Sequence, residues 1–510
     1  MKGSQHFLLY SSLFATSLAY LNSHDLLAKT KQGQVRGFKV NDDVNAFLGI
    51  PFAEPPVGPL RWQPPQPAKQ WGDEQAFNAS KFGDSCYQFH YYYGILSSDA
   101  NGSTNDPVLV QNNQSEDCLT LNVFVPRNRP AKNLPVFFWS YGGGFVEGST
   151  ALPVYNPTNF VEETKDIIVV TSNYRIGLWG FPNSPALPIT GQNLGIRDVR
   201  LALEWVRENI ASFGGNPDHI VMGGESAGAA NTDVVTFAYP EDPIIKAAIL
   251  SSGTVQIASI IGDDEADNEF VRVATSVGCA DSDRKKELAC MVQVDGLKLK
   301  HAVSNLTFNP FGAPSGGTPM VDNVTVFSIE EYINKTIAGD FAHIPTFIGI
   351  QDKEGDSLGA ITPDGQVNRT ASDETTNIMF NCPASLQASV RRGFNIPVWR
   401  YRFMGAFPSV TPLSDVGAYH GEDIFFLWNT INEIAPGLIT AQPFEVEAAK
   451  YLQKAYADFI RDPESGLEKK RHWPKYNQNA TTLIQFFPNQ SANAVLGDPR
   501  PFDEVCLTLS

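Results

Sequence analysis

Short apolar runs recur along the middle of the chain, with longer stretches of mixed character between them. Runs of this length, with few polar interruptions, are typical of strands that are covered on both faces of a sheet. The predicted strands occupy residues 136–139, 167–171, 220–222, 247–250, 344–350 and 398–403. Between the second and third strands, four apolar residues recur at the spacing of an amphipathic helix: Val199, Leu203, Val206 and Ile210. Strands that alternate with helices predict an α/β fold, with a central, mostly parallel sheet flanked by helices.

The first part of the sequence has a different pattern. Residues 35–40 and 44–50 are strand-like and are separated by a polar turn. The Pro-rich stretch 51–67 that follows cannot form a helix or a central strand, so we expect it to run over the surface.

The chain shows no internal division. Its 510 residues would suggest about three domains of ordinary size, but no linker, repeat or break in composition separates them. With 42% apolar and 18% charged residues, the composition is typical of a globular protein with a large core. We predict that residues 20–510 form a single α/β domain with long inserted loops.

The net charge of −17 argues against nucleic acid as a partner, because a polyanion would be repelled rather than neutralised. The basic run Lys469-Lys470-Arg471 is short, and the solvated end of a helix explains it.

The N-terminus has the pattern of a secretory signal. Lys2 precedes an apolar stretch at residues 7–18, and Ser17-Leu18-Ala19 offers small residues for cleavage. The stretch is shorter than the roughly 20 residues that a membrane-spanning helix needs. We therefore predict a signal peptide at residues 1–19, secretion, and no stable membrane anchor.

Cysteines and glycosylation motifs agree with an extracellular protein. The six cysteines are an even number, which suits disulfides in an oxidising compartment. Nine Asn-x-Ser/Thr motifs indicate a glycosylated surface. The candidate acceptors are Asn78, Asn101, Asn113, Asn305, Asn323, Asn334, Asn368, Asn479 and Asn489.

A candidate nucleophile lies between the predicted strand 220–222 and an Ala-rich, helix-prone segment. Gly224-Glu225-Ser226-Ala227-Gly228 has the two glycines and the strand–turn–helix setting of a nucleophile elbow. A second pentapeptide of the same form surrounds Ser357, but a polar segment separates it from the preceding strand and Pro363 follows soon after. We therefore predict Ser226 as the nucleophile and Ser357 as a loop residue.

The glycine triplet Gly142-Gly143-Gly144 directly follows the predicted strand 136–139. Esterases carry their oxyanion loop at this place, because glycines let backbone N–H groups approach a developing oxyanion. Tyr141 stands where many esterases have His. Together with Ser226, the triplet predicts an oxyanion hole.

The order of residues in α/β-hydrolases is nucleophile, acid, His. If the acid follows the strand 344–350, only His420 and His472 remain as the base, and His472 lies in a basic, exposed-looking stretch. We therefore predict His420. The loop after the strand contains Asp352, Glu354 and Asp356, and each could orient the imidazole.

These features resemble the type-B carboxylesterase/lipase family, which includes cholinesterases, fungal lipases and carboxylesterases. The matching stretches follow the family's order over most of the chain: Phe47-Leu48-Gly49-Ile50-Pro51, Glu116-Asp117-Cys118-Leu119-Thr120-Leu121-Asn122, Tyr141-Gly142-Gly143-Gly144-Phe145, Gly214-Gly215-Asn216-Pro217 and Gly224-Glu225-Ser226-Ala227-Gly228-Ala229. The resemblance implies an α/β-hydrolase fold.

The resemblance also implies roles for single residues. It selects Glu354 as the acid, with Lys353 where the family commonly has Asp, and His420-Gly421 fits the family's His. It implies that the N–H groups of Gly143, Gly144 and Ala227 form the oxyanion hole. The implied disulfides are Cys86–Cys118, Cys279–Cys290 and Cys382–Cys506.

The implied reaction is hydrolysis of a small carboxylic ester through an acyl-enzyme, with no metal or other cofactor. Glu225, beside the nucleophile, is expected to be a buried supporting carboxylate. Within residues 87–117 lie Phe89 and the consecutive Tyr91, Tyr92 and Tyr93, followed by polar sequence with two glycosylation motifs. Such a loop suits an aqueous setting better than an oil surface, so we expect soluble or short-chain esters. A true lipase, a catalytically silent adhesion-type homologue and an enzyme for natural-product esters or lactones remain alternatives.

Overall fold

The computed structural model describes residues 26–88, 113–127, 132–260, 268–305, 317–358, 362, 366–411, 414–434 and 439–507. The predicted signal peptide, Asn101, Phe89 and the three tyrosines that follow it lie outside the described residues.

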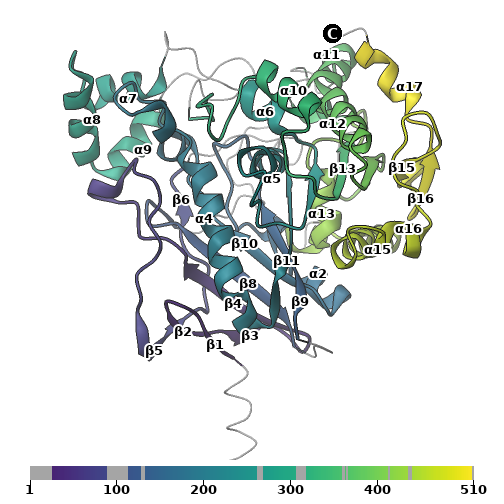
Figure 1. The fold of residues 1–510 in the computed structure, drawn as a ribbon, viewed down its shortest axis with the longest axis horizontal. Helices are drawn as coiled ribbons and strands as arrows, with labels where there is room; N and C mark the ends of the chain where they lie inside the picture. The colour runs from purple at the N-terminus through teal and green to yellow at the C-terminus, as the bar shows by residue number, and fades with distance from the viewer. Residues whose placement is uncertain are drawn as a thin grey trace, which may run out of the picture.

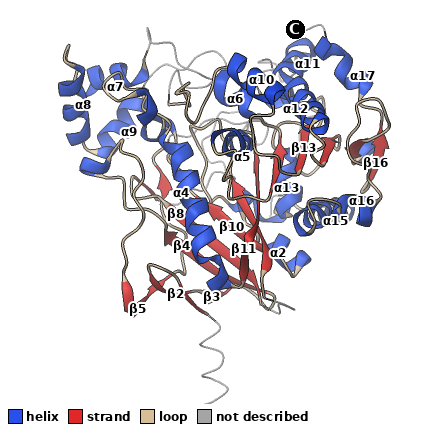
Figure 2. Ribbon diagram, viewed as in Figure 1, coloured by secondary structure: helices blue, strands red, loops and turns tan. Residues whose placement is uncertain are grey.

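A single large sheet forms the centre of the molecule (Figures 1 and 2). Its strand order is β16-β15-β14-β13-β12-β11-β9-β10-β8-β4-β3. In chain order the strands are β3 (Phe38–Lys39), β4 (Val44–Pro51), β8 (Thr120–Pro126), β9 (Leu134–Ser140), β10 (Ile168–Ser172), β11 (Gly215–Glu225), β12 (Ala247–Ser251), β13 (Thr346–Gln351), β14 (Val398–Phe403), β15 (Leu483–Phe486) and β16 (Ala494–Gly497).

The sheet is parallel in its middle and antiparallel at both margins. All pairings from β10 through β9, β11, β12, β13 and β14 to β15 are parallel. Antiparallel pairings add β8, β4 and β3 on one side and β16 on the other. The predicted α/β-hydrolase fold is thus confirmed. The strands β3 and β4 are joined by a short turn, which permits only antiparallel pairing.

Helices cover both faces of the sheet. Every residue of β10, β12, β13 and β14 is accordingly buried. One group contains α4 (Leu194–Asn209), α5 (Ala227–Ala238) and α12 (Cys382–Gly393), and the buried ion pair Arg391–Asp233 joins α12 to α5. A second group contains α2 (Thr158–Thr164), α13 (Glu422–Trp428) and α15 (Pro443–Arg461), which pack against one another. All four apolar residues that predicted the helix at α4 are fully buried.

The remaining elements surround this core. The smaller strands are β1 (Leu27–Lys29), β2 (Gly33–Arg36) and β5 (Gly72–Asn78), which form one sheet, and β6 (Ser85–Cys86) and β7 (Gln114–Ser115), which form another. The other α-helices are α3 (Gly177–Gly180), α6 (Val255–Ile260), α7 (Glu269–Val277), α8 (Arg284–Gln293), α9 (Gly296–Ser304), α10 (Ile329–Ala338), α11 (Arg369–Thr375), α14 (Ile431–Ile434), α16 (Gly466–Arg471) and α17 (Arg500–Asp503). Two further helical segments are the 3-10 helix η7 (Glu354–Ser357), which is wound more tightly than an α-helix, and the π-helix η8 (Thr376–Asn381), which is wound more widely.

Two expectations for the first part of the chain need correction. The strand expected at residues 35–40 is split into β2 and β3 at Gly37, whose Cβ would lie 2.5 Å from the carbonyl oxygen of Ala46. The Pro-rich stretch begins at Pro51, the end of β4, and contains the short 3-10 turn η1 (Gly58–Leu60) and an isolated bridge between Ala53 and Pro67. It does not lie wholly on the surface. Phe52 and Trp62 are 1% exposed, because Phe52 belongs to the main core and the ring of Trp62 packs on Phe270, with centroids 5.0 Å apart.

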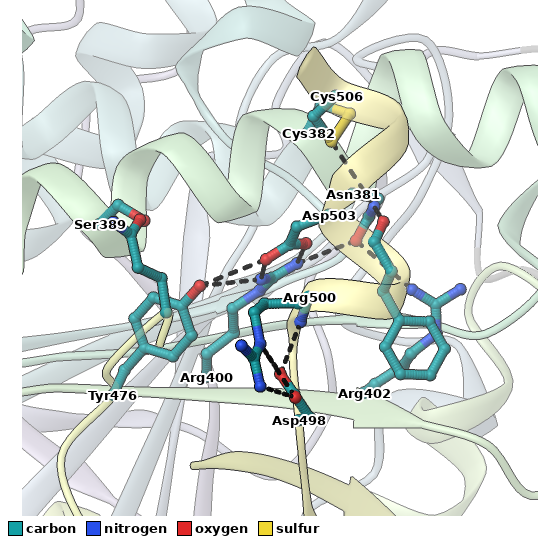
Figure 3. A network of polar contacts seen from close by, with 12 residues as sticks. Asn381, Cys382, Ser389, Arg400, Arg402, Tyr476, Asp498, Arg500, Asp503 and Cys506 are labelled. Carbon is teal, nitrogen blue, oxygen red and sulfur yellow. Dashed lines mark hydrogen bonds and ion pairs between the residues drawn. A yellow bond between two sulfur atoms is a disulfide. The ribbon is translucent and has the colours of Figure 1, made fainter. Parts of the chain in front are cut away.

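Three disulfides connect the described residues: Cys86–Cys118, Cys279–Cys290 and Cys382–Cys506. These are the pairs that the resemblance implies. The third ties the segment after β16 to α12 near a buried charge (Figure 3). There Arg400 of β14 binds Asp503 through both Nη atoms, at 2.5 and 2.8 Å, and its Nη2 also donates to Asn381.

The surface agrees with the glycosylation motifs as far as it is described. The eight candidate asparagines within the described residues are all exposed: Asn78, Asn113, Asn305, Asn323, Asn334, Asn368, Asn479 and Asn489. Among the helices of the described segments, none has both the length and the apolar character needed to cross a membrane.

Loop length predicts unequal roles for two of the disulfides. Cys382–Cys506 closes 124 residues and Cys279–Cys290 closes 11. In the chain-entropy account, replacing the first pair by Ser costs about 5 kcal/mol of stability and replacing the second about 3 kcal/mol. Thermal midpoints of the two double variants, measured at one scan rate, should therefore fall in that order. The reverse order would show that native-state contacts outweigh loop closure.

Candidate active site

Ser226 occupies the sharp turn between β11 and α5. Its backbone has φ 56° and ψ −124°, which is uncommon for a residue with a side chain. The flanking glycines make the turn possible. A Cβ on Gly224 would lie 2.3 Å from the carbonyl oxygen of Gly228, and one on Gly228 would lie 2.0 Å from that of Ser140. The side chain of Ser226 is therefore held at the end of a buried strand, with 7% of the residue exposed.

The glycine triplet lies directly against this turn. A Cβ on Gly142 would lie 3.0 Å from the Cβ of Ser226. Gly143 and Gly144 have φ of 102° and 59°, a region that favours glycine. In the part of the chain that the structure describes, the N–H groups of Gly143, Gly144 and Ala227 donate no hydrogen bond. Three donors next to Ser226 are thus available to a ligand.

Tyr141 anchors the start of the glycine loop. Its ring stacks on Tyr174, with centroids 4.6 Å apart. Each hydroxyl donates to the backbone oxygen of the other residue, at 3.2 Å from Tyr141 and 2.9 Å from Tyr174. These two reciprocal hydrogen bonds hold the first residue of the glycine loop against Tyr174. Tyr141 stands at the position where many esterases carry His.

His420 and Glu354 come from loops that follow the neighbouring parallel strands β14 and β13. Nδ1 of His420 lies 2.6 Å from Oε2 of Glu354, although the residues are 66 positions apart. The other carboxylate oxygen, Oε1, accepts the backbone N–H of Gln351 at 2.8 Å. Phe380 packs on the imidazole, with ring centroids 4.9 Å apart. Glu354 is fully buried, so the imidazole is held by a carboxylate that is itself fixed.

The second imidazole nitrogen faces the neighbour of the serine. Nε2 of His420 lies 3.2 Å from Oε1 of Glu225, the residue that precedes Ser226. No hydrogen bond joins His420 to Ser226 Oγ within the described structure. Catalytic hydrogen bonds in unliganded enzymes are often open and close when substrate binds.

Burial and charge set the protonation of these groups. Burial lowers the pKa of His420, but the carboxylates of Glu225 and Glu354 more than offset this effect and raise the pKa to about 9. Burial raises the pKa of Glu225 to about 8, although His420 opposes this shift. Because Glu225 and His420 face each other, their protonation is coupled, and the pKa values of both groups are raised.

A third carboxylate, Asp423, lies in the same buried region. Burial raises its pKa to about 6, while a hydrogen bond from Ser251 opposes this shift. Ser251 Oγ donates to Oδ2 of Asp423 at 2.5 Å. Asp423 follows His420 by three residues, and that spacing was the only signal that could have pointed to it in the sequence.

The other sequence candidates lie elsewhere. Asp352 accepts a hydrogen bond from Arg402 at 2.5 Å, and Asp356 binds Arg369 at 2.9 Å, so neither faces His420. Ser357 ends the 3-10 turn η7 rather than an elbow. His472 is exposed after α16, at the end of the basic run.

Comparison with known proteins agrees with this arrangement. The profile of the carboxylesterase family matches residues 24–377 and 362–497, which together include most of the chain. The chain belongs to the carboxylesterase family. It is accordingly a carboxylic ester hydrolase, and its substrates are esters.

Three characterised relatives illustrate the range of this carboxylesterase's family. A chlorogenic acid esterase of Aspergillus niger is 34% identical over 506 residues, which cover 95% of this chain and 94% of that protein. Secreted lipase 5 of Gibberella zeae is 33% identical over 492 residues, covering 91% and 90%. A cholinesterase of Mus musculus is 39% identical over 300 residues, covering 57% and 47%.

The tight turn at Ser226 predicts intolerance to any side chain at Gly228. Because the added Cβ of Gly228→Ala would meet a backbone oxygen at 2.0 Å, we expect a loss of about 3 kcal/mol of stability and little folded protein. Gly393→Ala is the matched control, since no atom lies within 4 Å of its Cβ. Yield and thermal midpoint of both variants test this. Equal behaviour of the two would show that the elbow can relax.

Proposed function

We propose that this carboxylesterase hydrolyses its ester through Ser226, His420 and Glu354. The observation that carries the proposal is the 2.6 Å contact between His420 and Glu354, placed next to the residue that precedes Ser226. A fixed carboxylate that orients an imidazole near a serine on a strained turn is the arrangement that serine hydrolases use.

The reaction proceeds in two steps. Ser226 Oγ attacks the ester carbonyl while Nε2 of His420 takes the hydroxyl proton, and Glu354 stabilises the imidazolium. His420 then gives that proton to the leaving alcohol, which leaves an acyl group on Ser226. Water, deprotonated by His420, attacks the acyl-enzyme; the bond to Ser226 Oγ then breaks, His420 returns the proton to Oγ, and the carboxylic acid is released.

The N–H groups of Gly143, Gly144 and Ala227 receive the developing oxyanion in each step. Their support is that they are unpaired within the described residues and lie beside Ser226. Each such donor contributes roughly 3–4 kcal/mol to the transition state.

We further propose that the enzyme is secreted and acts on soluble or short-chain esters. Exposure of the eight described candidate asparagines and the pairing of all six cysteines suit an extracellular protein. Two relatives over nearly the whole chain are a chlorogenic acid esterase and a secreted lipase, so esters of phenolic acids and of fatty acids define the range to be tested.

The first test compares the wild type with Ser226→Ala on p-nitrophenyl esters of increasing acyl length and on chlorogenic acid. We expect the highest kcat/KM on short or phenolic acyl groups, and a fall by a factor on the order of 10⁴ or more in Ser226→Ala, because the nucleophile is removed. Ser357→Ala, the other serine in a Gly-x-Ser-x-Gly sequence, serves as the control and should retain activity.

Other outcomes separate the alternatives. A maximum on long, emulsified esters would identify a lipase. Turnover that persists in Ser226→Ala would contradict the proposed nucleophile, and absence of turnover on any ester would contradict the proposed substrate range.

The position of Glu225 predicts a change in pH dependence. The acid limb of kcat/KM reports the free enzyme's imidazole, which must lose its proton to act as a base. Since Glu225 raises the pKa of His420, Glu225→Gln lowers that pKa and moves the acid limb to lower pH. Asp498→Asn, which removes a carboxylate paired with Arg500 away from the site, should leave the limb in place. An unchanged limb in Glu225→Gln would show that the 3.2 Å contact does not govern the base.

A further inference from the structure

Asp356 is a buried carboxylate that the proposed reaction does not use. It follows Glu354 by two residues on the same 3-10 turn and has no exposed surface. Its oxygens accept hydrogen bonds from Nη1 of Arg369 at 2.9 Å and from Oγ of Ser372 at 2.5 Å, both on α11. The third donor is the backbone N–H of Gly417, at 2.8 Å.

The bond to Gly417 reaches the segment that carries the base. Gly417 precedes His420 by three residues, and the neighbouring Ala418 accepts the backbone N–H of Lys353 at 2.8 Å. These two hydrogen bonds flank Glu354 on its own turn. The turn of the acid and the segment of the base are thus joined at Lys353, at Asp356 and through the side chains of Glu354 and His420.

The junction is closely packed. A Cβ on Gly417 would lie 2.7 Å from Cγ of Lys353, so the two segments approach as far as glycine allows. The acid turn is fixed from its other side as well. Gly355 donates its N–H to Thr376 of η8 at 3.0 Å, and a Cβ on Gly355 would lie 2.3 Å from the carbonyl oxygen of Ser372.

We propose that Asp356 is a positioning residue, which sets the distance and direction of His420 relative to Glu354 by holding the backbone N–H of Gly417. This inference rests on the proposed roles of Glu354 and His420. Without the acceptor, the partly buried N–H of Gly417 loses its partner, and the segment that leads to His420 gains freedom to move away from the acid. The hydrogen bond between His420 and Glu354 then weakens, and with it the stabilisation of the imidazolium.

The consequences differ from those of a purely structural residue. Misalignment of the base lowers kcat, roughly ten- to a hundred-fold, while KM stays within about twofold because the substrate's own contacts are not touched. A weaker bond to Glu354 also lowers the pKa of His420, so the acid limb of kcat/KM moves to lower pH.

The test compares Asp356→Asn with Asp415→Asn. In Asp356→Asn one of the two acceptor oxygens becomes an NH2 donor, which opposes either the N–H of Gly417 or the donors on α11. Asp415 lies 3.4 Å from the other Nη atom of Arg369 but does not touch Gly417, so its variant alters the same arginine and leaves the junction intact. The concentration of active sites is measured by titrating a separate sample with a p-nitrophenyl phosphonate. On unlabelled enzyme, kcat is then calculated from that concentration, and KM and the pH profile are measured. We expect the loss in kcat and the shifted limb in Asp356→Asn alone.

The proposal is overturned if Asp356→Asn lowers the thermal midpoint but keeps the wild-type kcat per titrated site and the wild-type acid limb, or if Asp415→Asn behaves identically. Should Asp356→Asn fail to fold, Arg369→Gln decides, because it leaves the carboxylate without its orienting cation. That variant must then show a smaller change in the same direction. Failure of the phosphonate to label Ser226 in the wild type would instead contradict the proposed nucleophile, whatever the result at Asp356.

Discussion

The contact between the imidazole of His420 and the carboxylate of Glu354 is the interaction on which the arrangement of the site depends. It joins two loops that follow adjacent parallel strands, so it exists only if β13 and β14 pair in the observed register. A shift by one residue would turn the side chains of a strand to the opposite face of the sheet. The aromatic core around Phe347 and Tyr401, which lie on these two strands, therefore fixes the geometry of groups far from it.

The hydrogen bond between His420 and Glu354 lies in a region that contains more carboxylates than basic groups. Glu225, Glu354 and Asp423 surround one imidazole in a region with almost no solvent. Three buried carboxylates opposite a single base cannot all be ionised without a large desolvation cost, and burial accordingly raises the pKa of Glu225 and Asp423. Burial favours the protonated form of Glu225, and the positive charge of the imidazole faces carboxylates rather than water.

Much of the fold follows from the sequence, because the central strands are buried on both faces and therefore appear as apolar runs. The turn at Ser226 was also visible, since only glycine fits at Gly224 and Gly228. The outer strands were less apparent. β8 was not recognised as a strand, and β15 and the edge strand β16 are short elements with mixed residues. The antiparallel pairing of β8 and of β16 depends on contacts between segments that no local pattern contains.

The separation of Asp352, Glu354 and Asp356 shows the corresponding limit at the site. All three are carboxylates on one loop, and only a resemblance to known proteins singled out Glu354. In the folded chain they have different partners: a side chain of β14, the imidazole, and a backbone N–H with α11. A backbone donor leaves no trace in the identity of residues, so the link from Asp356 to Gly417 could not have been read from the sequence.

The pairing of Arg400 with Asp503 also has a consequence for the order in which the protein matures. The partners are 103 positions apart, and the guanidinium lies in a strand whose every residue is buried. During synthesis from the N-terminus, β14 is made long before the carboxylate that neutralises it. An unpaired buried cation is strongly unfavourable, so we expect this side of the sheet to reach its final packing only after Asp503 is present. The loop of Glu354 follows β13, which pairs directly with β14, so the loop lies beside the strand that depends on Asp503. The C-terminal segment is thus needed to complete the surroundings of a strand next to the site.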